Sequence, residues 1–84
     1  MIYQVRFTKE AKKDIAKLTP KLKQKLQEII RDKISIDPYG GKKLVGALTG
    51  FFSLRLSYKD RIIYTIDQDQ QIIYIHRAKT HYGE

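Results

Sequence analysis

The clearest pattern of apolar and polar positions along the chain lies in residues 50–67. Apolar side chains occupy every second position in both halves of this stretch: Phe52, Leu54, Leu56, Ile62, Tyr64 and Ile66. A period of two, rich in aromatic and β-branched residues and interrupted by the polar segment 58–60, predicts a β-hairpin. One face of the hairpin is expected to supply a core, while the other carries Arg55 and Arg61. A guanidinium group rising from a sheet is well placed to hold a phosphate.

Two further stretches have the character of strands. Residues 2–7 alternate, with Tyr3, Val5 and Phe7 on one side. Residues 71–77 are apolar on both sides, which is typical of a strand in the interior of a sheet. With the hairpin, these stretches make four predicted strands.

Between the first strand and the hairpin, apolar residues recur at the spacing of an α-helix. They form two stripes: Ala11, Ile15 and Leu18, then Leu22, Leu26, Ile29, Ile30 and Ile34. Thr8 and Thr19 precede these stripes as N-caps, and Pro20 fits the first position of the second helix, which is predicted to end near Ser35. Two amphipathic helices joined by so short a link are expected to form a helical hairpin packed on the sheet.

The order of these elements predicts one α+β domain over residues 1–84, with βααβββ topology. Two antiparallel N-terminal helices pack on a mainly antiparallel four-stranded sheet. Residues 37–49 contain Pro and Gly turn signals, so we predict a mobile loop that brings Lys42 and Lys43 beside the sheet. The glycines of this loop do not match a P-loop, because no GxxxxGK[ST] motif is present.

Charge narrows the functional classes. The 84 residues include 17 Lys and Arg against 9 Asp and Glu, a net charge of +8 and a sequence pI near 9.8. So basic a small domain is expected to bind a nucleic acid, or an acidic protein that masks such a site. The chain has no cysteine, no apolar run long enough for a membrane span and no signal-peptide pattern, so a cytoplasmic location without membrane contact is expected.

The acidic residues are scattered, and the two histidines are too few for a metal cluster, so neither a metal nor another cofactor is expected. RNA can be cleaved without a metal, because its 2′-hydroxyl can attack the neighbouring phosphate. This reaction needs a base, an acid and cations that stabilise charge on phosphorus. His81 suits the role of general acid or general base, and Arg55 and Arg61 suit binding of the phosphate. Tyr82 suits stacking on a nucleobase or orientation of the phosphate.

The same residues also have structural interpretations. Arg55 would then pair with an acid, Arg61 would brace the turn, and His81 and Tyr82 would belong to a frayed tail. His76, at the end of an apolar strand, is expected to be packed or hydrogen-bonded.

Three motifs resemble the RelE/YoeB superfamily of bacterial toxins. They are LTGFFSLR at 48–55, DRIIY at 60–64 and RAKTHYGE at 77–84, the last of which is similar to the YoeB branch. The resemblance covers essentially the whole chain. It implies a type II toxin that cuts mRNA in the ribosomal A site without a metal and is silenced by a cognate antitoxin.

By the same resemblance, Arg61 matches the arginine that stabilises the phosphate transition state, and His81, Tyr82 and Arg55 match other site positions. RNA contacts are expected from four further cations: Lys42, Lys43, Arg77 and Lys79. The YoeB branch has a glutamate as presumed general base, but residues 41–44 read Gly-Lys-Lys-Leu. The base is therefore open between His81 and the lysines.

Two alternatives remain at this point. One is the ParE branch, which shares the fold but inhibits DNA gyrase. The other is a non-catalytic basic module that binds RNA or an acidic protein. In each case we expect an acidic antitoxin segment, disordered until bound, across the basic surface.

Overall fold

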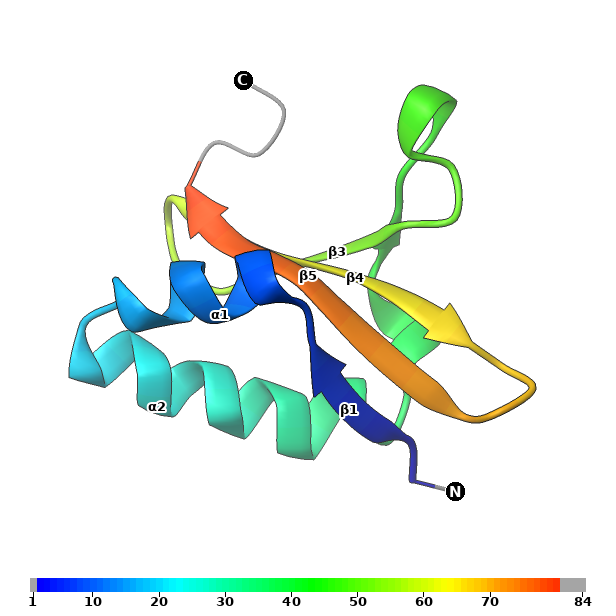
Figure 1. The fold of residues 1–84 in the computed structure, drawn as a ribbon, viewed down its shortest axis with the longest axis horizontal. Helices are drawn as coiled ribbons and strands as arrows, with labels where there is room; N and C mark the ends of the chain where they lie inside the picture. Colours follow the sequence, from blue (N-terminus) through cyan, green and yellow to red (C-terminus); the bar gives the residue numbers. More distant parts are fainter. Residues whose placement is uncertain (1, 81–84) are drawn as a thin grey trace.

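The computed structural model describes residues 2–80 of the chain, with the side chains of residues 2–78, and its elements follow the predicted order (Figure 1). The helices and strands are β1 (Gln4–Phe7), α1 (Lys9–Ala16), α2 (Pro20–Ile29), β2 (Lys42–Lys43), β3 (Phe52–Arg55), β4 (Asp60–Asp67) and β5 (Ile72–Thr80). A π-helical turn at Ile30–Ile34 extends α2, and 3₁₀ turns lie at Pro38–Gly40 and Gly46–Leu48. The α+β class is confirmed, with five strands instead of four.

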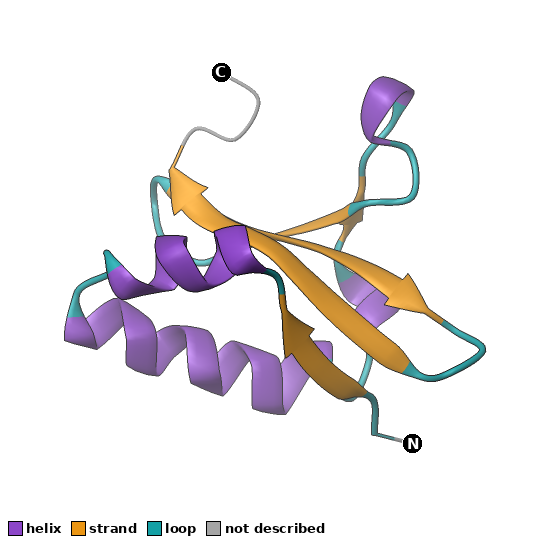
Figure 2. Cartoon of the chain, in the orientation of Figure 1, coloured by secondary structure: helices purple, strands orange, loops and turns teal. Residues whose placement is uncertain are grey.

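The sheet has the order β1-β5-β4-β3-β2. Only β1 and β5 pair in parallel, and the other neighbours are antiparallel. The predicted interior position of the last strand is confirmed, because β5 lies between β1 and β4. Both α-helices lie on one side of the sheet, with α1 along β5 (Figures 1 and 2). Neither helix combines the length and the apolar character of a membrane span.

Both helices begin at the predicted caps. The hydroxyl of Thr8 accepts a hydrogen bond from the backbone N–H of Ala11, and that of Thr19 accepts one from Leu22, each at 3.2 Å. Thr8 also joins the helix to the sheet, because its N–H donates to the carbonyl of Ile75 at 3.0 Å and its hydroxyl to that of His76 at 3.2 Å. These bonds fix α1 against β5 at the point where the pairing with β1 ends.

The core lies between the helices and the sheet, and the alternation of β3 and β4 is confirmed. Its fully buried members come from both layers: Ala11, Leu26, Ile34, Leu56, Ile62, Tyr64, Ile73 and Ile75. Ile63 is an exception to the alternation, because it is 1 % exposed although it lies on the opposite face of β4 from this core. That face therefore buries some apolar surface of its own.

The prediction of a loop throughout residues 37–49 is wrong at Lys42 and Lys43. These residues form the edge strand β2, in register with Ser53 and Phe52 of β3. A strand of two lysines has no alternation that a sequence pattern can reveal, and the backbone pairing with β3 alone defines it.

Tyr64 anchors this segment to the core. Its ring stacks on Phe52 at a centroid distance of 5.6 Å, and its hydroxyl donates to the carbonyl of Pro38 at 2.7 Å. Burial raises the pKa of Tyr64 to about 12. Gly41 lies directly against the Tyr64 hydroxyl, in space that a Cβ atom would fill.

We expect Gly41→Ala to lower the free energy of unfolding by about 1–3 kcal/mol, because its methyl group overlaps the Tyr64 hydroxyl. The backbone of Gly41 is extended, at φ −75° and ψ 170°, so the effect comes from packing alone. Urea denaturation measures it, with Gly40→Ala as the matched control, since the nearest atom to that Cβ lies at 3.5 Å. Equal stability of the two variants would contradict the expectation.

Candidate nucleic-acid interface

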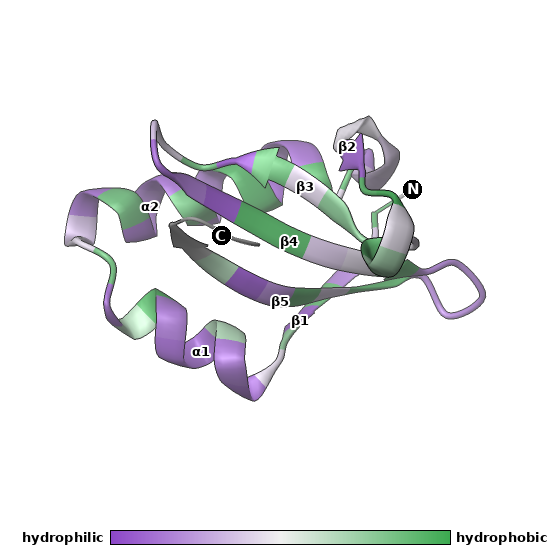
Figure 3. Ribbon diagram, turned by 90° about the horizontal axis from the view of Figure 1, so that it is seen from above, coloured by the Kyte–Doolittle hydropathy of each residue, from purple (hydrophilic) through white to green (hydrophobic). Residues whose placement is uncertain are grey.

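The face of the sheet opposite the helices gathers cations in adjacent rows across the strands. Arg55 of β3 lies opposite Arg61 of β4, which in turn lies opposite Lys79 of β5. We call these three positions the cationic row. Paired residues of neighbouring strands point to the same side, so both arginines point away from the core. Figure 3 looks onto this face, with β3, β4 and β5 in front of α2.

Arg55 and Arg61 form a pair of like charges at directly opposed positions, an arrangement that costs free energy in a sheet. Within the described chain neither has a carboxylate at ion-pair distance. The turn before β4 is braced by Ser57, whose hydroxyl donates to Asp60 Oδ2 at 2.8 Å and accepts from the Asp60 N–H at 3.1 Å. Arg55 therefore lacks the acidic partner of its structural interpretation, whereas Nη1 of Arg61 donates to the backbone carbonyl of Asp60 at 3.4 Å, at the end of that turn. An anion between the two guanidinium groups would stabilise the pair.

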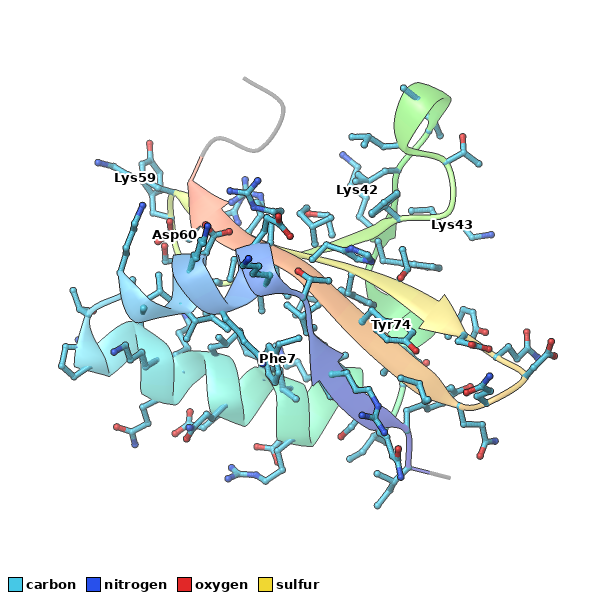
Figure 4. All side chains as sticks on the ribbon, in the orientation of Figure 1. Phe7, Lys42, Lys43, Lys59, Asp60 and Tyr74 are labelled. Carbon is cyan, nitrogen blue, oxygen red and sulfur yellow. The ribbon has the colours of Figure 1, made fainter. Side chains whose placement is uncertain are left out.

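The second row along the sheet contains Lys42 and Arg77. Lys42 lies opposite Ser53, Ser53 opposite Ile63, and Ile63 opposite Arg77. Lys42 therefore shares the face of the cationic row, while Lys43, one residue further on, points to the other side (Figure 4). Of the two adjacent lysines, only Lys42 extends this cationic surface.

Arg77 has a partner in the helical layer. Its Nε and Nη2 donate to the two carboxylate oxygens of Asp14 on α1, at 2.8 and 3.2 Å. Asp14 is 9 % exposed and also accepts from the backbone N–H of Ala78 at 3.2 Å. This ion pair fastens α1 to the part of β5 that lies beyond β1, so Arg77 positions the strand that carries the end of the cationic row.

A β-bulge in β5 places His76 on the same face. Tyr64 pairs with Ile75 while Ile63 pairs with Arg77, which leaves His76 as the extra residue. Its Nε2 lies 2.8 Å from the Thr65 hydroxyl, and its ring meets Phe51 edge-on at a centroid distance of 5.1 Å. The prediction of a packed, hydrogen-bonded histidine is confirmed.

Burial lowers the pKa of His76. The unfolded chain therefore takes up this proton at a higher pH than the folded one, and the stability contributed by the neutral ring is lost as the pH falls below about 6.5. We expect the free energy of unfolding to decrease between pH 7.5 and 5.5, and to decrease less in His76→Gln. Urea denaturation at both pH values checks this, and identical slopes for the two proteins would refute it.

The roles of all the predicted site residues stay predictions. His81 and Tyr82 lie outside the described residues, as does the side chain of Lys79. Among the described residues no group of three or more His, Cys, Asp or Glu side chains is placed to hold a metal. The general base stays open between His81 and the lysines.

Four residues on this face were not predicted from the sequence: Arg6, Phe51, Tyr74 and Thr65. Arg6 lies opposite Tyr74, and Tyr74 opposite Thr65. The sequence does contain a signal of the bulge. The buried apolar residues of β5 are two positions apart from Ile73 to Ile75, but three positions apart from Ile75 to Ala78.

Comparisons with known proteins identify relatives of the same size. A family model described as the ParE-like toxin of type II bacterial toxin–antitoxin systems matches residues 5–83. No curated protein matches the chain.

Among solved structures, the RelBE2 toxin–antitoxin complex from Mycobacterium tuberculosis is similar with 33% identity and a TM-score of 0.87, covering 96% of this chain and 100% of that one. The YoeB–YefM complex from Staphylococcus aureus has 28% identity and a TM-score of 0.72, covering 98% and 100%. The E. coli toxin RelE bound to a peptide of the antitoxin RelB shares the fold at 19% identity, with a TM-score of 0.80 over 99% of this chain and 87% of that one.

Proposed function

This chain belongs to the ParE-like toxin family of type II bacterial toxin–antitoxin systems, and from that premise we propose that it is a metal-independent endoribonuclease that cuts mRNA on the ribosome. The observation that carries the proposal is the cationic row. Arg55 and Arg61 lie opposite each other on two neighbouring strands, and neither has an acidic partner in the described chain, an arrangement that suits an anionic substrate.

The reaction assigned to this site is an attack within the RNA strand. The 2′-oxygen loses its proton to a base and bonds to the adjacent phosphorus, while the bond from phosphorus to the 5′-oxygen breaks and an acid protonates the leaving oxygen. Arg61 and Arg55 stabilise the extra negative charge on the phosphoryl oxygens. We assign to His81 the role of acid or base, and to Tyr82 contact with the nucleotide. Lys42 and Lys79 would hold neighbouring phosphates.

An antitoxin would silence this chain by covering the same face. The RelBE2 and YoeB–YefM structures contain toxin and antitoxin together. For this chain we propose a cognate antitoxin with an acidic segment, because such a segment would neutralise part of the +8 charge and exclude RNA.

Primer extension on an mRNA under translation tests the activity. We expect new 5′ ends within the codon in the ribosomal A site after the purified toxin is added, and none when the antitoxin is added first. Intact mRNA at toxin concentrations that saturate the ribosomes would refute the proposal.

Inhibition of DNA gyrase is the second candidate, because the matching family model is ParE-like. A gyrase supercoiling assay separates the two functions. Loss of the supercoiling activity of gyrase, with translated mRNA left intact, would show that the chain is a gyrase inhibitor.

A further inference from the structure

We propose that Phe51 and Tyr74, on the same face as the cationic row, form a stacking site for an RNA base within a few nucleotides of the scissile phosphate. We call these two residues the aromatic pair. The inference rests on the proposed function, because it assigns this surface to the same RNA strand.

The register of the sheet sets the position of the aromatic pair. Tyr74 lies opposite Thr65 of β4, four residues along that strand from Arg61. At 3.3 Å per residue, this separation is about 13 Å along the strand direction. Phe51 directly precedes β3 and has the same alternation as Ser53 and Arg55, so it lies on the same face. A strand of RNA whose phosphate contacts the cationic row therefore reaches the aromatic pair within a few nucleotides.

The two rings do not serve the core. Neither Phe51 nor Tyr74 belongs to the core cluster or to the residues packed against it, and both are only partly buried. Phe51 is held by the edge contact with His76, whose ring is fixed in turn by Thr65. Within the described chain Tyr74 has no aromatic partner, so its ring can accept another ring.

Cations lie on both sides of the aromatic pair. Arg6 of β1 is exposed and pairs in register with Tyr74, while Lys42 and Arg61 lie towards the other end of the face. Aromatic rings interleaved with basic side chains bind single-stranded nucleic acids, because the cations hold the phosphates and the rings stack on the bases. An acidic peptide would use the same cations without using the rings.

Binding of a short single-stranded RNA, followed by fluorescence anisotropy, tests the site. We expect Tyr74→Leu to weaken binding about tenfold, since the stacking of one base on the ring is lost. Tyr74→Phe keeps the ring and should bind as the wild type does. Tyr58→Leu is the matched control, because Tyr58 is 86 % exposed in the turn before β4. Circular dichroism verifies that each variant is folded.

Two further probes separate stacking from charge. On an oligonucleotide of the same length without bases, Tyr74→Leu should bind like the wild type. Arg6→Ala should weaken binding to both oligonucleotides, and it should reduce the salt dependence of the affinity by the amount expected for about one phosphate contact. Tyr74→Leu should leave this salt dependence unchanged.

Two outcomes would overturn the stacking site and leave the proposed function standing: unchanged affinity of Tyr74→Leu for the RNA with bases, or an equal loss on both oligonucleotides. An equal loss for Tyr74→Leu on poly-glutamate would assign the surface to an acidic protein instead. Failure of the wild type to bind any RNA at low salt would remove the support for both proposals.

Discussion

Replacement of Arg61 with alanine is expected to slow mRNA cleavage at least about 100-fold, the effect of removing one donor from a site that stabilises an oxyanion. Arg61 is partly buried at the start of β4, opposite Arg55 of β3 and Lys79 of β5. In the transition state an additional charge develops on the phosphoryl oxygens, and a guanidinium group held by a strand meets that charge without reorganisation. The rate of appearance of cleaved mRNA by primer extension, under single-turnover conditions, measures the effect.

Lys59→Ala is the control for Arg61→Ala. Lys59 lies two residues earlier, in the exposed turn before β4, so its removal changes the net charge equally but leaves the cationic row intact (Figure 4). We expect it to retain nearly full activity. A folded Arg61→Ala protein that cleaves at the wild-type rate would exclude Arg61 from the site.

Replacement of Asp14 with asparagine is expected to lower the free energy of unfolding by about 2–4 kcal/mol. The carboxylate accepts two hydrogen bonds from Arg77 and one from the Ala78 N–H, and it is 9 % exposed. An amide of the same shape accepts fewer of these bonds and turns an N–H₂ group towards the guanidinium. Urea denaturation at pH 7 measures the loss.

Two further variants isolate the ion pair. Glu10→Gln removes an exposed carboxylate from the same helix and should change stability by no more than about 0.5 kcal/mol. Combined with Arg77→Met, Asp14→Asn should cost less than the sum of the single changes, because one interaction is removed twice. Strict additivity of the two changes would show that Asp14 stabilises the fold without Arg77.

Several features follow from the local sequence alone. The threonines before each helix, the apolar stripes and the alternation of residues 50–67 were all predicted correctly. These signals can be interpreted because a helix and a strand each repeat over a few residues, so neighbours in the chain determine which face a side chain occupies. The same logic placed Arg55 and Arg61 on one face before their register was known.

Other features were decided only by tertiary contacts. The strand at Lys42 exists because it pairs with β3, and the bulge at His76 arises because β5 must place Ile75 and Ala78 in the core across a change of register. Asp14 and Arg77 are 63 positions apart, and their pairing depends on α1 lying along β5. A local pattern determines which way a side chain points, but the partner it meets depends on which distant strands or helices become neighbours, and that is decided by packing the whole chain.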